Sequence, residues 1–570
     1  MKIIGIHDGH NASVSLLDNG KITFALQEER VRNEKNYFGF PEKSLDFLLK
    51  YNKLEVKDID AIVFAGEYMS PPMTKEEFMS HFAKQGSVLM TIIKKISKIS
   101  FFKKIRVIKN KKRRIELAKK FGFPEEKITF VDHHLCHAAA AYFGLAKDWN
   151  KKYLILTLDG GGDWLCSTVN IGFQGKIKKI AETSYGNSLG DIYSRTTFMM
   201  GFTPWEHEYK LMGMAPYASK KYGEKVKEIY KKYLDLNKKN PLTFSRKIFK
   251  DTNHIVRRLR KDLEGQRFDN ICFGLQDFTE ELIVKWVREC IKQTGINDLI
   301  CGGGVFMNVK ANKAIAEMPE VNSIEIFPSC GDESNSMGAA WLIYNNRVKE
   351  NHFNGLNDYY LGPLFSDEEV ENTIKKFLRK NNFYFQKIEN INSKIAELLA
   401  DGKIVARCSG RMEFGARALG NRSILADPIN QKIVNIINKM IKNRDFWMPF
   451  APIVLKEKSH LYIKNPKNIS SPYMMMAFET TDKKDEFIAA IHNADNTARM
   501  QILEKGQNQD LEEIINFFYQ KTGRAVLLNT SFNLHGHPIV FGPKEAIETF
   551  LNSGLEYLVI NNFLISKNEE

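Results

Sequence analysis

Cysteine is scarce in this sequence, with 7 residues among 570, and no two of them form a Cys-x-x-Cys pair. A disulfide framework or a zinc ribbon needs regularly spaced cysteines, so both are disfavoured and reduced thiols are expected. Long apolar runs are also missing, because no uninterrupted stretch reaches the roughly 18 residues that cross a bilayer. Residues 1–20 have charged and polar side chains where a signal peptide has an apolar segment. We therefore expect a globular, cytoplasmic protein without membrane spans.

Acidic residues are too few to balance the basic ones. Asp and Glu number 68 against 83 Lys and Arg, which gives a formal net charge of +15 and a pI near 9.1. An excess of this sign attracts polyanions such as nucleic acid, phosphates and acidic lipid surfaces. Much of the excess lies in residues 94–120, where Lys and Arg are interleaved with Phe and Ile. This pattern fits a solvated amphipathic helix, and it also fits a surface that binds a phosphate backbone.

Short apolar segments alternate with longer helical patterns, which is typical of an α/β protein. The strongest helical periodicity runs over 271–295 and ends in a glycine. Asn, Gly and Pro break the pattern at 350–369, which predicts a linker. Beyond it we expect a second α/β unit, with strands at 403–410 and 524–533 and a helix at 543–554. The clearest strands before the linker are expected at 2–7, 21–27, 61–66, 153–159, 298–304 and 323–328.

One pattern occurs twice: an apolar strand turns through Asp-Gly and returns as a second strand. The two copies are "IIGIHDGHNAS" and "LILTLDGGGD", and a third glycine-rich turn, "CGGGVFMN", follows at 301–308. Backbone amides at such turns can face an anion. Two hairpins in duplicated halves predict a nucleotide cleft of the actin or hexokinase type. The residues that we assign to this cleft, with a lysine from the later motif "EYKLMGMAPY", are Asp8, Asp159, Gly160, Gly161, Lys210, Gly302, Gly303 and Asn308.

Two histidines lie four residues apart in "VDHHLCHAAAAYFGL", residues 131–145. Residues with this spacing share one face of a helix, so His133 and His137 can bind one metal ion. Histidines at a helix start are also often caps or core residues, so a third ligand would strengthen the metal interpretation. Asp332 offers one, because it lies in a turn between a predicted strand and a small-residue helix. Two imidazoles and one carboxylate leave coordination positions open for the oxygens of a ligand.

These motifs, together with "GRMEFGARALGNRSILADP" and "LNTSFNLHGHPIV", resemble the O-carbamoyltransferases of antibiotic and nodulation-factor biosynthesis. The resemblance covers nearly the whole chain. It implies an actin-like carbamoyl-transfer domain over 1–355, related to threonylcarbamoyl-transfer proteins, and a YrdC-like domain over 356–570. It also implies a divalent metal at His133, His137 and Asp332, most often iron, with manganese and zinc as alternatives.

The resemblance implies a reaction in two steps. The second domain joins carbamoyl phosphate to ATP, which is bound with Mg²⁺, and gives carbamoyl adenylate and pyrophosphate. The first domain then transfers the carbamoyl group to an acceptor hydroxyl and releases AMP. By the same resemblance, Lys35 binds the donor and His10 is the general base, a task that suits an imidazole of near-neutral pKa.

Arginines gather in glycine- and phenylalanine-rich motifs of the expected second domain. Guanidinium groups bind phosphate oxygens bidentately, so several of them could neutralise carbamoyl phosphate and the ATP triphosphate. Polar side chains that alternate at the exit of the 524–533 strand are expected to bind ribose, phosphate or the carbamoyl amide. Met448 and His537 depart from the family, since many relatives have Arg and Glu there. The residues assigned to this site are Arg411, Arg417, Arg422, Arg444, Arg499, Asn529, Ser531 and Asn533.

Two other functions stay open from the residues alone. One is an actin-fold sugar kinase with an appended domain, which the arginine-rich second domain disfavours. The other is a non-catalytic nucleotide- or RNA-binding protein related to tRNA modification, which the candidate metal ligands and His10 disfavour. The acceptor is expected to be a hydroxyl of a sugar or natural product or, given the basic residues 94–120, of a hydroxymethylated base in nucleic acid. For the assembly of the protein, a homodimer stays open as an alternative to a single chain.

Overall fold

The computed structural model describes residues 1–84, 100–348 and 355–568. The basic residues 94–99 and part of the expected linker lie outside this description. The chain forms two compact units. The first comprises Met1–Glu28 and Asn36–Leu356, and the second comprises Glu29–Lys35 and Asn357–Glu570. The short segment Glu29–Lys35 therefore belongs to the second unit, although the sequence placed it in the first domain.

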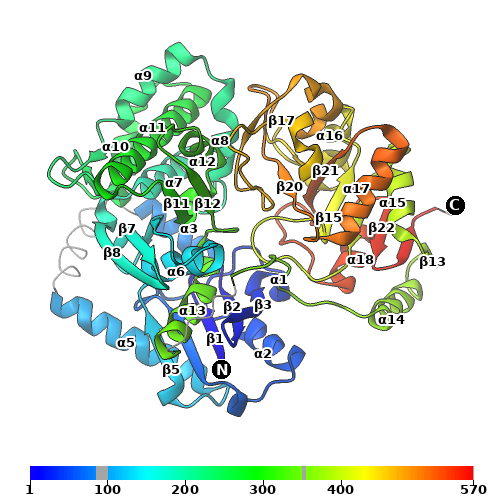
Figure 1. The fold of residues 1–570 in the computed structure, drawn as a ribbon, viewed down its shortest axis with the longest axis horizontal. Helices are drawn as coiled ribbons and strands as arrows, with labels where there is room; N and C mark the ends of the chain where they lie inside the picture. The colour runs from blue at the N-terminus through cyan, green and yellow to red at the C-terminus, as the bar shows by residue number, and fades with distance from the viewer. Residues whose placement is uncertain (85–99, 349–354, 569–570) are drawn as a thin grey trace. The chain divides into compact units, whose positions relative to one another are not determined.

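The first unit contains two five-stranded sheets with the same topology (Figure 1). In each, three antiparallel strands in hairpin order continue into two parallel strands. The first sheet runs β3 (Lys21–Gln27), β2 (Ser13–Asp18), β1 (Lys2–His7), β4 (Ala61–Ala65), β5 (Ile128–Val131). The second runs β8 (Lys176–Ser184), β7 (Leu165–Phe173), β6 (Tyr153–Gly162), β11 (Asp298–Gly302), β12 (Ser323–Ile326). This repeat confirms the duplicated α/β fold of the actin and hexokinase type.

Two helices rich in small residues pack against each other and against the two sheets. They are α6 (His133–Leu145), which contacts β6 and β11, and α13 (Asn335–Arg347), which contacts β1, β2 and β4. Their backbones lie so close that a Cβ added at Gly338 would come 2.0 Å from the carbonyl oxygen of Cys136. Small side chains are therefore required here, because a larger residue would separate the helices.

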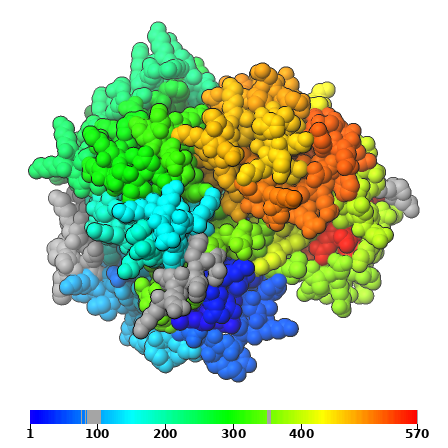
Figure 2. Space-filling view, viewed as in Figure 1, coloured from blue at the N-terminus to red at the C-terminus, as the bar shows by residue number. Residues whose placement is uncertain are grey.

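The first unit contains further helices. The longest is α11 (Phe268–Thr294), which ends at Gly295 in the left-handed region with a φ of 68°, close to the helix expected at 271–295. The lysine-rich start of α9 (Lys220–Tyr230) is exposed and forms a projection on the surface of this unit (Figure 2). The others are α2 (Glu42–Tyr51), α3 (Lys75–Lys84), α5 (Ser100–Lys119), α7 (Leu189–Met199), α8 (Glu208–Met214), α10 (Val256–Asp262) and α12 (Val309–Ala316), beside a hairpin of β9 (Leu234–Leu236) and β10 (Phe244–Arg246).

The second unit is built on a mixed eight-stranded sheet, which confirms the second α/β unit expected beyond the linker. Its strands run β13 (Tyr384–Lys387), β23 (Phe563–Ser566), β22 (Tyr557–Ile560), β14 (Val405–Cys408), β15 (Arg422–Ala426), β21 (Val526–Ser531), β16 (Ala451–Leu455), β20 (Gln501–Leu503). This unit also contains a small three-stranded sheet of β17 (Ile463–Lys464), β18 (Phe478–Thr480) and β19 (Thr497–Ala498). Its helices include α14 (Asp367–Leu378), α15 (Ile391–Ala400), α16 (Lys432–Ile437), α17 (Gln509–Thr522) and α18 (Pro543–Leu551).

The expectations about membrane spans, thiols and the linker can be compared with the structure. Among the described residues, no helix combines the length and the apolar character needed to cross a membrane. All seven cysteines are buried and free. The expected linker at 350–369 extends too far, because Ser366 caps α14 and its side chain accepts a hydrogen bond from the backbone of Glu369.

Candidate functional site

Helix α6 holds the histidine pair at its first turn. Asp132 caps the helix, since its side chain accepts a hydrogen bond from the backbone N–H of Leu135 at 2.8 Å. His133 and His137 then fall on one face, as their spacing predicts. His134 points away from that face, with its Nδ1 2.9 Å from Oγ1 of Thr157. The local sequence therefore separates two histidines that face a common point from one that belongs to the core.

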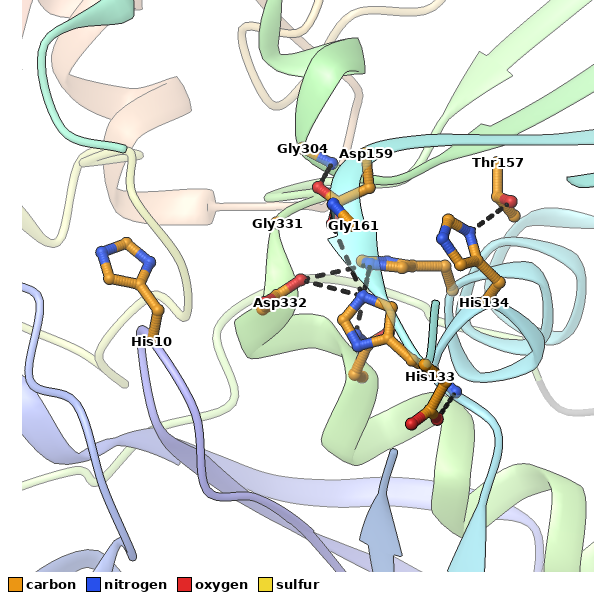
Figure 3. Close-up of polar contacts among 12 residues, drawn as sticks. His10, His133, His134, Thr157, Asp159, Gly161, Gly304, Gly331 and Asp332 are labelled. Carbon is orange, nitrogen blue, oxygen red and sulfur yellow. Dashed lines mark hydrogen bonds and ion pairs between the residues drawn. The ribbon is translucent and has the colours of Figure 1, made fainter. Parts of the chain in front are cut away.

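A compact group of nitrogen and oxygen donors surrounds the pair (Figure 3). The Nε2 atoms of His133 and His137 are 3.2 Å apart, and they lie 3.4 and 3.3 Å from Oδ1 of Asp332. Oδ2 of Asp159 is 3.5 Å from Nε2 of His133. One donor atom from each of the four residues lies within 4.8 Å of the others. The structure thus brings together the three predicted metal ligands and adds Asp159, which the sequence assigned to the nucleotide cleft.

Glycines allow the strand ends to reach the helix. A Cβ at Gly162 would come 2.2 Å from the His133 ring, and a Cβ at Gly303, whose φ is 100°, would come 2.4 Å from the carbonyl oxygen of Leu158. The N–H groups of Gly304 and Gly161 donate to the Asp159 carboxylate at 3.1 and 3.3 Å. These turns therefore orient Asp159 toward the histidines.

Charge is concentrated in this small buried volume. Burial by itself would lower the pKa of His133. The carboxylates of Asp332 and Asp159 outweigh this effect and raise that pKa to about 10. Burial also works against ionisation of the two carboxyl groups, yet the neighbouring histidines lower the pKa of both. Burial lowers the pKa of His7 to about 4, with Asp332 acting in the opposite sense. His7 is therefore neutral near pH 7.

The donor set fits a divalent cation. Ligand atoms about 2.0–2.2 Å from one ion lie roughly 3.0–3.5 Å apart, and the His133, His137 and Asp332 atoms have this spacing. Oδ1 of Asp332 is buried and has no hydrogen-bond partner in the described part of the chain. Nitrogen donors from histidine with carboxylate oxygens suit iron, manganese or zinc. A bound cation would displace the proton of His133, because a ligating imidazole must be neutral.

His10, the predicted base, lies on the turn after β1 and is not a member of the four-residue group (Figure 3). His7 connects the two: its Nε2 is 3.1 Å from the carbonyl oxygen of His10 and 3.8 Å from Oδ2 of Asp332. Because a neutral imidazole that faces a carbonyl must donate, the proton of His7 lies on Nε2. The sequence reasoning missed His7, although it stands in the quoted "IHDGH" motif.

The other residues assigned to the cleft differ in their surroundings. Asp8 is paired with the buried Arg114 of α5 at 2.7 Å. Asn308 caps α12 and exchanges hydrogen bonds with Gln276, at 2.9 Å each. Lys210 lies 5.2 Å from the ring centroid of Phe202. A Cβ at Gly302 would approach the carbonyl oxygen of His137 to 3.0 Å, whereas one at Gly160 would have no atom within 4 Å.

The predicted arginines of the second unit differ in how much of the guanidinium is engaged. Arg422 is buried and donates to carbonyl oxygens of its own loops, including that of Asn421 at 3.0 Å. Arg411 donates to the carbonyl oxygen of Leu361 at 2.8 Å. Arg444 donates to Oγ1 of Thr530 at 3.1 Å and lies over the Phe450 ring. Arg417 and Arg499 are partly exposed.

A buried lysine that the sequence reasoning missed lies among these residues. Lys442 is 3% exposed, and its ammonium donates to Ser531 and, at 2.7 Å, to Oδ1 of Asn533. Burial, with the charges of Arg444 and Lys35, holds the pKa of Lys442 well below its usual value. Arg444 and Lys35 therefore lie near Lys442, within one unit. Asn529, also assigned to this site, is buried and donates to Gln501 at 2.8 Å.

A polar cavity of about 410 Å³ in the second unit is a separate feature. Arg407, Ser409 and Asp510 contribute to its lining. The lining contains none of the residues that the sequence assigned to donor binding.

Comparison with known proteins matches both units of the chain. Residues 2–341 match the family domain described as Carbamoyltransferase N-terminus, and residues 396–567 match the one described as Carbamoyltransferase C-terminus. The chain belongs to the carbamoyltransferase family. The resemblance found in the sequence motifs is therefore confirmed, and the sugar-kinase and non-catalytic alternatives are not supported.

Relatives of this carbamoyltransferase span its length. It is 31% identical over 570 residues to the nodulation protein NolNO of Sinorhizobium fredii, covering 98% of this chain and 79% of the relative. It is 31% identical over 568 residues to the uncharacterized protein MJ1051 of Methanocaldococcus jannaschii, covering 99% of each. Solved structures are more distant: component A of (R)-2-hydroxyglutaryl-CoA dehydratase from Acidaminococcus fermentans has a TM-score of 0.33 at 12% identity, over 61% of this chain and 98% of its own. HypF of T. kodakarensis has a TM-score of 0.33 at 13% identity, over 60% of this chain and 48% of its own.

Within the carbamoyltransferase, the sequence motifs therefore supply charged groups to each unit. The first unit holds a histidine and carboxylate group, and the second holds a cationic group around Lys442. His7 and Lys442 lacked a distinctive spacing in the sequence. A signal was nevertheless present for Lys442, because it precedes the predicted Arg444 by two residues, at the end of the helical segment Asn438–Lys442.

Proposed function

We propose that this carbamoyltransferase is an ATP-dependent O-carbamoyltransferase that acts in the cytoplasm through a carbamoyl adenylate. The single observation that supports this most is the group of His133, His137, Asp159 and Asp332, whose donor atoms are spaced for one divalent cation and which His7 places near the backbone of the His10 turn. Carbamoyl phosphate, ATP with Mg²⁺ and a hydroxyl compound are the proposed substrates.

The YrdC-like second unit would make the activated donor. Carbamoyl phosphate and water give carbamate and phosphate, and a carbamate oxygen then attacks the α-phosphorus of ATP. The bond to the β-phosphate oxygen breaks and pyrophosphate leaves, so carbamoyl adenylate forms. Lys442, Arg444 and Lys35 would offset the charge that builds up on the phosphate oxygens.

The first unit would transfer the carbamoyl group. The acceptor hydroxyl oxygen attacks the carbamoyl carbon, its proton moves to the ring of His10, and the bond from that carbon to the AMP phosphate oxygen breaks. His10 then returns the proton to solvent. His7 would hold the His10 turn in place through its hydrogen bond to the His10 carbonyl oxygen.

The group of His133, His137, Asp159 and Asp332 would hold the metal ion. When bound, a divalent cation supplies positive charge that polarises the carbonyl or phosphate of the donor. Iron is the metal that we propose, with manganese and zinc as competitors. The Asp159 carboxylate, which accepts hydrogen bonds from the backbone N–H groups of Gly161 and Gly304, would be held in position to contact that ion.

The test measures which products the protein forms from ATP. Purified protein is incubated with ATP, Mg²⁺ and labelled carbamoyl phosphate, with and without hydroxyl acceptors, and AMP, ADP, phosphate and pyrophosphate are quantified. We expect pyrophosphate only when carbamoyl phosphate is present, and AMP with a labelled carbamate when an acceptor is added. Release of ADP, or no dependence of ATP turnover on carbamoyl phosphate, contradicts the proposal.

Two acceptor classes are proposed, a sugar or natural-product hydroxyl and a hydroxymethylated base in nucleic acid. The second rests on the exposed lysines of α5, which include Lys104, Lys109 and Lys112. Arg114 of the same helix is buried against Asp8 and would not contact a polyanion. The basic stretch is therefore partly structural and partly free for contact with phosphates.

A further inference from the structure

Trp205 has an unusual backbone conformation beside His10. Its φ is 63°, in the left-handed region that bulky side chains rarely adopt. The turn is fixed by short-range hydrogen bonds: the N–H of Trp205 donates to Oε1 of Glu208 at 2.8 Å, and the N–H of His207 donates to the carbonyl oxygen of Thr203 at 2.9 Å. Backbone conformations of this kind persist where the surrounding structure enforces them, and they concentrate at functional sites.

The strained turn leaves the indole partly uncovered. Trp205 is 40% exposed. Its ring is supported by Phe78 and Phe82 of α3, with ring centroids 4.9 and 5.8 Å away. Phe82 is itself buried and lies 4.0 Å from the guanidinium carbon of Arg195. Trp205 therefore stands on a rigid aromatic base instead of filling the core, so burial of its own surface does not explain the strained turn.

The exposed indole lies next to the proposed base. The ring centroids of Trp205 and His10 are 5.5 Å apart, with the planes at 68°. A hydroxyl that gives its proton to His10 must approach the imidazole to about 3 Å, so the rest of that acceptor lies within reach of the indole. An aromatic face offers stacking to ring compounds and little to a flexible acyclic chain.

We propose that Trp205 is an acceptor-binding wall that selects ring-bearing hydroxyl compounds and positions their hydroxyl at His10. This inference rests on the proposed function, because it takes His10 as the base. It assigns a specificity-determining role to a residue outside the glycine and histidine motifs. Its chemistry is recognition of a flat or low-polarity ring face, with the reacting hydroxyl at the ring edge.

The experiment separates acceptor binding from donor activation. Wild type, Trp205→Ala and Trp205→Tyr are assayed for carbamoyl phosphate-dependent pyrophosphate release and for carbamoyl transfer to monosaccharides, aminoglycosides and nucleosides, with glycerol and sorbitol as acyclic acceptors. We expect Trp205→Ala to raise KM for the best ring acceptor about tenfold, with a smaller change in kcat. Trp205→Tyr should restore most of the loss, and pyrophosphate release should be unchanged.

The matched control is Phe249→Ala, since Phe249 is 89% exposed in the same unit and belongs to the loop after β10. It should leave every parameter as in wild type. An unchanged KM in Trp205→Ala, an equal loss with glycerol and sorbitol, or an equal loss of pyrophosphate release overturns the inference. So does a wild type that releases pyrophosphate and carbamoylates none of the ring compounds. A wild type that releases no pyrophosphate contradicts the proposed function instead.

Discussion

The Nε2 atoms of His133 and His137 lie 3.2 Å apart and face the same carboxylate oxygen of Asp332. One N–H···N hydrogen bond can join the two imidazole nitrogens at this separation, whereas a cation between them and the carboxylate would satisfy all three atoms. The relationship joins one turn of α6 to a residue that follows it by almost 200 positions, and it makes metal binding directly testable.

Replacing His137 with alanine should abolish tight metal binding. We expect metal affinity to fall about 100-fold or more, because one of two nitrogen ligands is removed. Equilibrium dialysis against Fe²⁺ without oxygen, and against Zn²⁺, measures the loss. His10→Ala is the control and should bind metal as wild type does. Equal metal binding by His137→Ala and wild type would contradict a metal site at this histidine pair.

His10→Ala should separate the two proposed steps. The rate of carbamoyl transfer should fall about 10²–10⁴-fold, the range for loss of a general base. Pyrophosphate release should continue, because Lys442 and its neighbours lie in the other unit. His460→Ala, which removes an exposed histidine, is the matched control. If both steps fall together in His10→Ala, the residue supports the fold and is not the base.

Lys442→Met should lower pyrophosphate release about 100-fold, as expected when a buried hydrogen-bond donor near developing phosphate charge is lost. The exposed Lys439, one turn earlier, provides the control Lys439→Met, which should keep its activity. Steady-state assays with varied ATP and carbamoyl phosphate measure both variants. Normal donor activation in Lys442→Met would exclude this lysine from the donor site.

The same lysine should affect stability as a function of pH. Its pKa is lowered by burial, so at pH values between the folded and the unfolded pKa the folded state binds fewer protons than the unfolded state. This contribution to the free energy of unfolding therefore rises with pH until the unfolded lysine also loses its proton, near pH 10.4. Thermal melts between pH 7 and pH 10 should show a smaller upward trend in Lys442→Met than in wild type. Identical trends would contradict the lowered pKa.

Arg114→Met should destabilise the first unit by about 3–5 kcal/mol, because it leaves Asp8 buried without its partner. Chemical denaturation measures the change. Lys112→Met, on an exposed part of the same helix, should stay within about 0.5 kcal/mol of wild type. The double variant with Asp8→Asn should lose less than the sum of the single changes. Additive losses would mean that the pair contributes nothing as a pair.

Alanine at Lys104, Lys109 and Lys112 should weaken binding to duplex DNA if the acceptor is part of a nucleic acid. The slope of log affinity against log salt should become shallower by about 0.9 for each phosphate contact that is lost. Fluorescence anisotropy over a salt series gives the slope. Wild-type protein that shows no DNA binding at low salt, or binding that does not weaken with salt, rules out this acceptor class.

Local patterns predicted much of the architecture. The strands at 2–7 and 21–27 and the helix that ends at Gly295 follow from apolar periodicity and a left-handed C-cap, both of which act over a few residues. The shared face of His133 and His137 follows in the same way from the 3.6-residue turn.

Partners that are distant in the sequence could not be predicted in this way. Asp8 was assigned to a nucleotide turn, yet it pairs with Arg114 from the basic stretch. Arg422 lies in a motif similar to those of the other predicted arginines. Its guanidinium, however, donates hydrogen bonds to carbonyl oxygens of its own unit. Burial decides such cases, because a buried guanidinium needs internal acceptors and an exposed one does not.

The sequence by itself determined the repeated strand-turn-strand units, the helical face of the histidine pair and the family to which the chain is similar. Only the tertiary structure decided that Asp159 joins that pair, that His7 connects His10 to Asp332, and that Lys442 is buried among cations. The reason is physical: periodicity fixes which side chains share a face over one or two turns. Close approach of segments hundreds of residues apart depends instead on packing, such as the glycine contact between α6 and α13.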